Sequence, residues 1–214
     1  MAKKGTSGRP IGRGSDWADR AFGRGPTGLS AEAFARWYRE EVAAQWEAVD
    51  LKAVAHVAGW LRAARGTKRQ VFVAGNGGSA AIASHMATDL AKTAATGSGP
   101  LLRCVALTDN VSYMTAIAND IGYDAVFSRQ MENLLNKGDI VILISGSGNS
   151  PSVLEAARYA RRKGARTAAL LGFDGGKLKS LVDVPLLVGC GQYGVVEEIH
   201  MGIGHVLGFY LRQA

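Results

Sequence analysis

Four side chains in two distant stretches could together perform acid–base or metal chemistry. His85 and Asp89 stand four residues apart, so a helix would place both on one face. Glu197 and His205, near the end of the chain, add a second carboxylate and a second imidazole. Zinc binds such nitrogen and oxygen atoms, and the same groups serve as general acids and bases. By spacing alone, however, His85 is more simply explained as a histidine near a helix N-cap or at an interface that bonds to backbone.

Two loops rich in glycine and serine could bind a phosphate. Each follows an apolar run and precedes a helical stretch; they are residues 75–79 (GNGGS) and 145–150 (SGSGNS). Glycine lets the backbone approach a ligand closely, and free amides at a helix start favour an anion. Neither loop matches a P-loop or a dinucleotide fingerprint. Either loop alone could be a tight turn with a serine N-cap, but two at one sheet edge predict a phosphorylated ligand.

The elements that must position these residues alternate along the chain. Continuous apolar runs predict strands buried on both faces, at 71–74, 102–107, 140–144, 167–171 and 184–188. Helical spacing predicts helices at 79–93, 111–133, 151–163 and 195–212. This alternation predicts an α/β fold with a doubly wound, five-stranded parallel sheet flanked by helices. Ligands of such sheets bind at the carboxyl ends of the strands, where both loops would lie.

The amino-terminal part of the chain divides into a tail and a helical extension. Apolar residues recur at helical spacing over residues 31–65, which predicts one long helix or two that pack on a broad surface such as another subunit. Residues 1–30 contain seven glycines and contribute +4 of the net charge of +7. We therefore expect residues 1–30 to be a flexible basic tail and residues 31–214 to be one domain. A nucleic-acid partner is not expected, because the remaining charge is small.

The composition indicates a cytoplasmic protein. No apolar run approaches the roughly 20 residues that span a bilayer, and no apolar stretch follows Lys3 and Lys4 to form a signal peptide. Cys104 and Cys190 stand alone, without a CxxC pair. We expect them to be free thiols in a reducing compartment.

Several motifs, in order and at matching spacing, resemble the phosphoheptose isomerases, a subfamily of the sugar isomerase (SIS) domains. The resemblance covers about residues 35–212. It is carried by residues 75–79 followed by His85 and Asp89, then 118–123 (ANDIGY), 127–130 (FSRQ), 145–150, 174–178 (DGGKL) and 197–200 (EEIH), with His205 beyond. Each motif alone is weak, but the ordered set is specific.

The resemblance implies a flavodoxin-like SIS fold, a homotetramer with active sites at subunit interfaces, and often a zinc ion. It implies aldose–ketose isomerisation of sedoheptulose 7-phosphate to D-glycero-D-manno-heptose 7-phosphate through an enediol. By motif position, the substrate contacts would be Asn76, Gly77, Gly78, Ser79, Asn110, Ser145, Gly146, Ser147, Ser150 and Glu197. The metal positions would be His85, Asp89, Glu197 and His205, with Asp89 and His205 as the catalytic acid–base pair.

The chain departs from the family pattern at some of these positions. Asp89 and Glu197 stand where the family usually has Glu and Gln, which preserves ligand and base chemistry but changes reach and charge. Gly146, Asn110 and Thr93 replace a usual Thr, Asp and Arg. These three changes leave the identity of the sugar open.

The spacing of Glu197 and His205 raises a geometric difficulty. Eight residues of helix rise about 12 Å, which is far for two side chains to share one ion. Either the helix begins irregularly near Val195, or the site combines residues from two chains. We expect the second, because the family resemblance places the site at an interface.

Two other functions stay open from the sequence. One is a non-catalytic tetrameric SIS regulator that binds a sugar phosphate or a protein, and the other is an isomerase of a different sugar phosphate. The retention of His85, Asp89, Glu197 and His205 favours an enzyme over a regulator.

Overall fold

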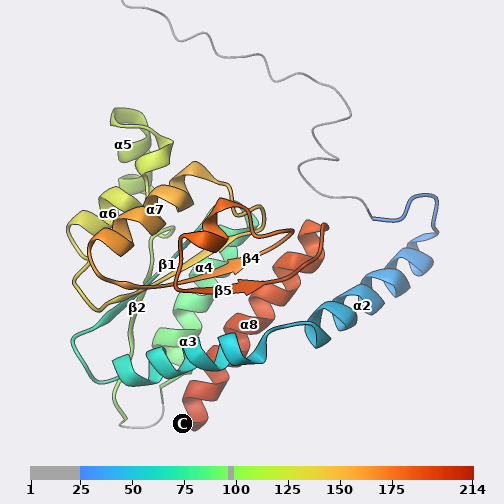
Figure 1. Cartoon of the computed structure of the whole chain (residues 1–214), viewed down its shortest axis with the longest axis horizontal. Helices are drawn as coiled ribbons and strands as arrows, with labels where there is room; N and C mark the ends of the chain where they lie inside the picture. The colour runs from blue at the N-terminus through green and yellow to red at the C-terminus, as the bar shows by residue number, and fades with distance from the viewer. Residues whose placement is uncertain (1–24, 96–98) are drawn as a thin grey trace, which may run out of the picture.

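A computed structural model describes residues 25–95 and 99–214, and its centre is a five-stranded parallel sheet with strand order β2-β1-β3-β4-β5 (Figure 1). The strands are β1 (Gln70–Gly75), β2 (Arg103–Ala106), β3 (Ile140–Ser145), β4 (Arg166–Leu171) and β5 (Val184–Leu187). Each predicted apolar run matches one strand to within a residue at either end. The prediction of a doubly wound parallel sheet is confirmed. All of β3 is buried, whereas β2 is an edge strand with alternately exposed residues.

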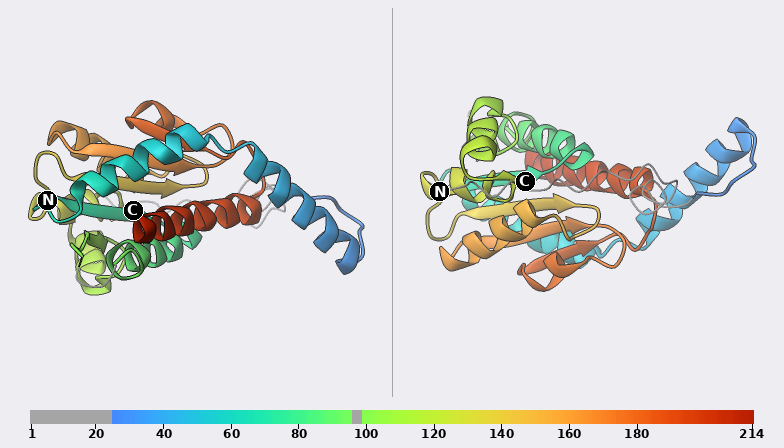
Figure 2. Two further views of the ribbon diagram at one scale, coloured as in Figure 1. Left: turned by 90° about the horizontal axis from the view of Figure 1, so that it is seen from below. Right: turned by 90° about the horizontal axis from the view of Figure 1, so that it is seen from above.

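Helices cover both faces of the sheet. One face packs against α3 (Leu51–Ala64), α4 (Gly78–Thr88) and α8 (Tyr193–Gln213), and the other against α5 (Val111–Asp120), α6 (Ser128–Glu132) and α7 (Pro151–Arg162). Alternate residues of β1 divide between the two cores: Val71 and Val73 belong to the first, and Phe72 and Ala74 to the second. Figure 2 shows α4 and α8 on the face opposite α7.

The helical extension consists of two helices, α2 (Ala31–Glu47) and α3, which was one of the two predicted arrangements. Ser30 caps α2 by accepting a hydrogen bond from the Ala33 amide, and Asp50 caps α3. No residue of α2 is buried, and the helix projects away from the sheet (Figure 1). Most of the predicted basic tail, residues 1–24, lies outside the described residues. Among the described helices, none has the length and apolarity to span a bilayer.

One predicted helix is wrong as a single element. The stretch 111–133 is broken into α5, a 3-10 turn at Tyr123–Ala125 and α6. The break lies at Gly122, whose φ of 133° is one that other residues rarely adopt. The chain therefore turns after α5, and the turn brings Tyr123 to the carboxyl edge of the sheet, where its hydroxyl donates to Asn76.

A buried histidine lies in α8 without a described partner. His200 is fully buried, and among the described residues neither ring nitrogen makes a hydrogen bond. Burial lowers the pKa of His200 from 6.5 to about 4, although the Leu171 backbone lies close enough to oppose part of this shift. His200 is therefore neutral at neutral pH.

This burial predicts a pH dependence of folding. Between pH 6.5 and about 4 the unfolded chain binds a proton that the folded chain does not. The free energy of unfolding should therefore fall as the pH is lowered through this window, by about 3 kcal/mol in total. Urea unfolding across the window should show a shallower dependence for His200→Leu, whereas His56→Leu, at an exposed position of α3, should keep the wild-type profile. An unchanged profile for His200→Leu would contradict the assignment.

Candidate functional site

The two glycine- and serine-rich loops meet at the carboxyl ends of β1 and β3, which are neighbouring strands. Together with the start of α8 they surround a cavity of about 120 Å³, which we call the cradle. It is lined by Asn76, Ser79, Ile144, Ser145, Gly146, Ser147, Ser150, Tyr193 and Glu197. Most of the predicted substrate contacts are therefore close to one another.

Two helices begin at the cradle. Gly77, with a φ of 58°, precedes α4, and Ser150 precedes α7, whose first residue is Pro151. The unpaired amides and the positive ends of both helix dipoles favour an anion at this place. The hydroxyls of Ser79 and Ser150 make no hydrogen bond within the described part of the chain, so both can donate to a ligand. The cradle has the donors that a phosphate requires.

Asn76 is fixed from two sides. Its amide nitrogen donates to the Ser152 hydroxyl at 3.0 Å, and its carbonyl oxygen accepts from the Tyr123 hydroxyl at 2.9 Å. These bonds connect the loop after β1 to α7 and to the turn after α5. The first loop is thereby held rigidly at the edge of the cradle.

Tyr193 is a cradle residue that the sequence analysis missed. Its ring occupies the space that a side chain at Gly146 would need. The departure from the family pattern at Gly146 is thus matched by an aromatic ring from the start of α8. No local motif marks Tyr193, because the contact joins segments 47 residues apart in the sequence.

Glu197 lies in the cradle beside the first residue of α4. A methyl group added to Gly78 would collide with the Glu197 carboxylate. Desolvation by burial raises the pKa of Glu197. The carboxylate therefore sits near the amides at the start of α4, where it can accept hydrogen bonds from ligand hydroxyls.

His85, Asp89 and His205 form a second group, which we call the His–Asp–His cluster. One oxygen of Asp89 lies 3.0 Å from Nδ1 of His205 and 3.4 Å from Nε2 of His85. The Asp89 side chain is 10% exposed, whereas the two histidine side chains are nearly half exposed. One candidate ligand atom from each residue lies within 4.8 Å of the others, so the cluster could hold a metal ion.

The local backbone explains how Asp89 reaches this cluster. The helix that begins with α4 widens into a π-helical turn over Asp89–Thr93, with the Ala94 amide donating to the Asp89 carbonyl. Such turns often occur at functional sites. The turn packs on α8 at Gly208, where an added methyl group would lie 3.0 Å from Cβ of Asp89. A glycine at 208 therefore permits the close approach of the two segments.

Glu197 is not part of this cluster within one chain. It stands eight residues before His205 on α8, which is a rise of about 12 Å. The helix begins regularly at Tyr193, with Gln192 accepting from the Val195 amide, so the suggested irregular start near Val195 is wrong. Ser79 and Asp89 are separated along α4 and its π-helical turn in the same way, by ten residues or about 15 Å. The cradle and the cluster therefore lie at two separate positions along the same two helices.

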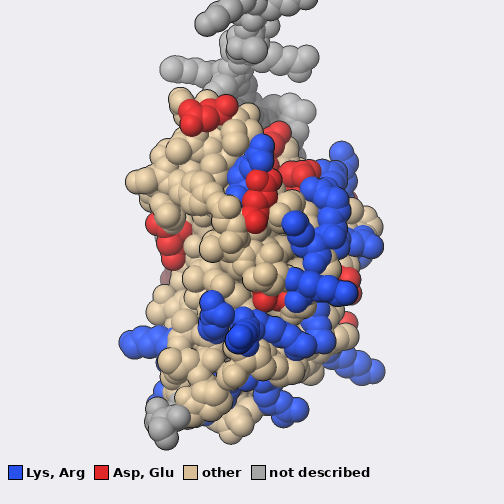
Figure 3. Space-filling view, turned by 90° about the vertical axis from the view of Figure 1, so that its left-hand side faces the viewer, with Lys and Arg blue, Asp and Glu red and all other residues tan. Residues whose placement is uncertain are grey.

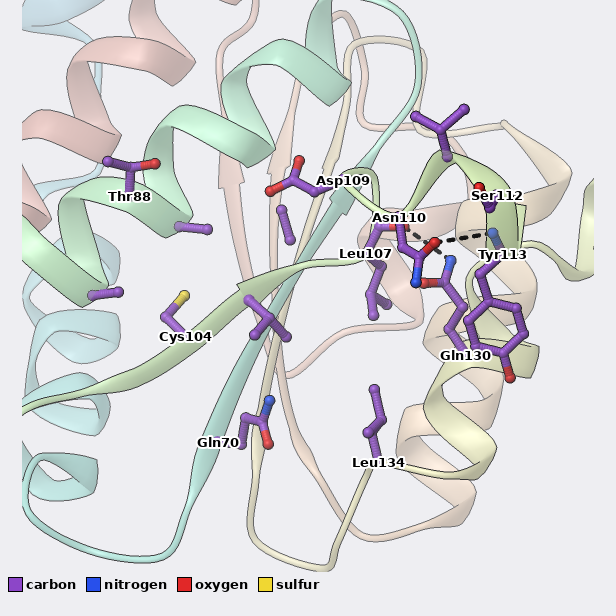
Figure 4. A pocket seen from close by; sticks show the side chains of 15 residues that line it. Gln70, Thr88, Cys104, Leu107, Asp109, Asn110, Ser112, Tyr113, Gln130 and Leu134 are labelled. Atoms are coloured by element: carbon purple, nitrogen blue, oxygen red, sulfur yellow. Dashed lines mark hydrogen bonds between the residues drawn. The ribbon is translucent and has the colours of Figure 1, made fainter. Parts of the chain in front are cut away.

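Asn110 lies outside the cradle. It lines a hollow of about 880 Å³ along β2, and its side chain caps α5 by accepting from the Tyr113 amide (Figure 4). Its neighbour Asp109 lines the same hollow and accepts a hydrogen bond from Ser84, the residue before His85 on α4. The structure does not bring Asn110 to the other predicted substrate contacts.

The contact between Gly78 and Glu197 can be tested by mutation. Gly78→Ala should lower stability by about 1–3 kcal/mol, because the new methyl group and the carboxylate overlap. Adding Glu197→Ala should recover part of this loss, and Gly59→Ala, which meets nothing within 4 Å, should be neutral or stabilising. Thermal unfolding of Gly78→Ala, Glu197→Ala, the double variant and the Gly59→Ala control measures the coupling. Strictly additive losses would show that the two residues do not touch.

The chain is similar in sequence and structure to known enzymes. The SIS domain family matches residues 37–172. The phosphoheptose isomerase of Pelodictyon phaeoclathratiforme is 41% identical over 181 residues, which is 84% of each chain, and a probable phosphoheptose isomerase of Thermoplasma acidophilum is 39% identical over 81% of this chain and 94% of its own. The structure of the phosphoheptose isomerase of Neisseria gonorrhoeae superposes with a TM-score of 0.78 at 32% identity, covering 86% of this chain and 98% of that one. The chain therefore belongs to the SIS domain family and, within it, to the phosphoheptose isomerases.

Proposed function

We propose that this protein converts sedoheptulose 7-phosphate to D-glycero-D-manno-heptose 7-phosphate through an enediol. Its family consists of sugar-phosphate isomerases, and relatives named phosphoheptose isomerase span most of the chain. The observation that carries the proposal is the placement of an anion cradle and a His–Asp–His cluster on the same two helices. A phosphorylated sugar likewise carries its charge at one end and its carbonyl at the other.

The reaction requires one proton to move between adjacent carbons. Asp89 is the base that removes a proton from C1 of the ketose, and His205 donates a proton to the C2 oxygen, which gives the enediol. Return of the carbon-bound proton to C2, with loss of the O1 proton, completes the aldose without any external oxidant or reductant. The 3.0 Å hydrogen bond between Asp89 and His205 supports this pairing, because it orients the carboxylate and fixes the imidazole.

The cradle supplies affinity and orientation. Ser79, Ser147 and Ser150, with the amides at the starts of α4 and α7, hold the phosphate. The second amide hydrogen of Asn76 can be donated to a sugar hydroxyl, and the Glu197 carboxylate can accept a hydrogen bond from another. Holding the distal phosphate reduces the motion of the reacting carbons relative to the base.

Zinc is the metal that we propose for the His–Asp–His cluster. Two imidazole nitrogens and one carboxylate oxygen are a ligand set that zinc accepts, and three protein ligands leave a position for a substrate oxygen. When bound, the ion would replace the hydrogen bond between Asp89 and His205 and would supply Lewis-acid stabilisation of the sugar oxygens. The acid–base roles of Asp89 and His205 are those of the metal-free site. Within one chain Glu197 belongs with the cradle, so any contribution of Glu197 to the ion requires a second chain.

A homotetramer with active sites at subunit interfaces is the assembly that we propose. Val206, Phe209 and Tyr210 are about half exposed on α8, next to His205. Val206 and Tyr210 line an apolar groove of about 290 Å³ between α3 and α8. A second chain that covers this face would bury the apolar residues and exclude water from the cluster. The free thiols of Cys104 and Cys190 support a cytoplasmic location.

A different sugar phosphate is the second candidate substrate. The chain departs from the family pattern at Gly146 and Asn110. The Tyr193 ring fills the space beside Gly146, and Asn110 lies outside the cradle. A parallel assay with other ketose phosphates distinguishes this candidate.

Turnover of sedoheptulose 7-phosphate, followed as aldose formation, tests the proposal. Asp89→Asn should lower kcat by about two to four orders of magnitude, because the base is lost. Asp124→Asn, at an exposed position, is the matched control and should keep the wild-type rate. Thermal unfolding should show that both variants fold. A wild-type rate for Asp89→Asn would remove Asp89 as the base, and no turnover by wild-type protein with or without zinc would contradict the proposed reaction.

Metal content provides a separate prediction. Purified protein loaded with zinc should retain about one ion per chain after desalting, and His85→Ala should lose most of it, because one of three protein ligands is removed. His56→Ala removes a histidine outside the cluster and should bind zinc as the wild type does. Equal zinc content in all three proteins would place the ion elsewhere.

A further inference from the structure

The amino-terminal edge of the sheet, opposite the cradle, carries cations that the proposed reaction does not use, and all of them are exposed except the half-buried Arg166. They precede or begin successive strands in the spatial order β2, β1, β3 and β4, and we call them the basic row: Arg103, Lys68, Arg69, Lys137, Lys163 and Arg166. Figure 3 shows this side of the molecule, where Lys and Arg side chains gather over much of the surface and carboxylates occupy smaller areas. The helix α2 lies at the opposite side of the molecule (Figure 1).

Contacts between neighbouring members show that the row is continuous. Arg103 donates from Nη1 to the Lys68 carbonyl at 3.0 Å. If Gly138 carried a side chain, its Cβ would lie 3.7 Å from Nε of Arg69. Lys137 packs on Gly164, which directly follows Lys163 in the sequence. The row therefore crosses four neighbouring strands, which is about 15 Å at the usual strand separation.

The central cations of the row have no partner that explains them. Lys68, Arg69 and Lys137 are exposed, and within the described residues their side chains make no hydrogen bond or ion pair. Two carboxylates lie close in sequence to this edge, those of Asp139 and Asp183. They accept hydrogen bonds from backbone amides at the starts of β1 and β4. The row therefore has a net positive charge that the fold itself does not use.

Arginines at the ends of the neighbouring helices have a simpler explanation. Arg158 and Arg162 both lie beside Glu155 on α7, at 3.6 and 3.3 Å. Cations in a last helical turn also stabilise the helix through its dipole. These residues add to the local positive electrostatic potential. They do not explain the central cations of the row, Lys68, Arg69 and Lys137.

The chemistry of the row favours a nucleic-acid backbone over a protein partner. Protein interfaces are depleted of lysine and depend on buried aromatic or apolar anchors. Two aromatic rings beside the row are covered by its own cations: Arg166 lies over Trp60 and Lys163 over Tyr159, each at 5.6 Å. An extended line of exposed charges suits instead a partner with regularly repeated anionic groups, such as phosphates.

We propose that the basic row binds the phosphate backbone of nucleic acid without reading its bases. This proposal departs from the expectation that the chain has no nucleic-acid partner, because that expectation rested on the net charge and not on where the charges lie. Those residues contribute +4 of the net charge of +7, and the modest remainder conceals an uneven distribution over the folded domain. The surface lies away from the cradle, so binding does not depend on the proposed isomerase activity.

Fluorescence anisotropy of a labelled duplex DNA of arbitrary sequence, titrated with the full chain at several NaCl concentrations, tests this proposal. The logarithm of Kd should change linearly with the logarithm of salt concentration. The double variant Lys68→Glu/Lys137→Glu should bind roughly tenfold or more weakly, and its salt dependence should be shallower by about two units of slope. Thermal unfolding and isomerase turnover should match the wild type, which shows that the variant is folded.

The matched control is Lys52→Glu/Lys179→Glu, which makes the same change in net charge at exposed positions outside the row. It should change Kd by no more than about twofold, because only the long-range field is altered. Residues 1–30 are identical in both variants, so binding through them would weaken both equally. The proposal would be overturned if the two double variants changed Kd equally, or if the wild type did not bind DNA at low salt. It would also be overturned if polyglutamate competed more strongly than unlabelled DNA.

Discussion

The site depends on one close contact, between the π-helical turn that continues α4 and the middle of α8. The Asp89 carboxylate, almost buried, meets His205 across this contact at 3.0 Å. Two glycines of α8 permit the approach: Gly204 faces Met86, and Gly208 faces Asp89 itself. Larger residues at either position would push the two helices apart, and the carboxylate would then lose the imidazole that orients it. The polar chemistry thus rests on the packing of small residues in the core beneath it.

The same pair of helices explains why the cradle and the cluster are arranged as they are. Helix α4 begins at the carboxyl end of β1, beside the end of β3, so its first turn necessarily faces the second loop. Its continuation lies about 15 Å farther along, where α8 presents His205. Glu197 occupies the corresponding early position on α8, next to Gly78. A long polar substrate can therefore be held at one end by helix amides and approached at the other by the carboxylate.

Much of this arrangement could be predicted from local pattern. Continuous apolar runs identified each strand, because strands buried on both faces require them. The i, i+4 spacing placed His85 and Asp89 together, and the family motifs added His205. The break at Gly122 was missed because apolar spacing continues across it, although a single positive φ ends the helix. Tyr193 and the basic row were missed because both arise from segments that only the folded sheet brings together. Asn110 was assigned to the substrate by motif position, whereas its side chain caps α5.

If Asp89 and His205 act as one unit, each single substitution should lower kcat/KM almost as much as the double substitution does. The most direct test is a double-mutant cycle on kcat/KM for sedoheptulose 7-phosphate, with Asp89→Asn, His205→Ala and the combined variant. We expect the combined variant to be no more than a few-fold slower than the slower single variant. Losses that multiply, so that the combined defect equals the product of the two single defects, would show that the carboxylate and the imidazole work independently and would contradict this account.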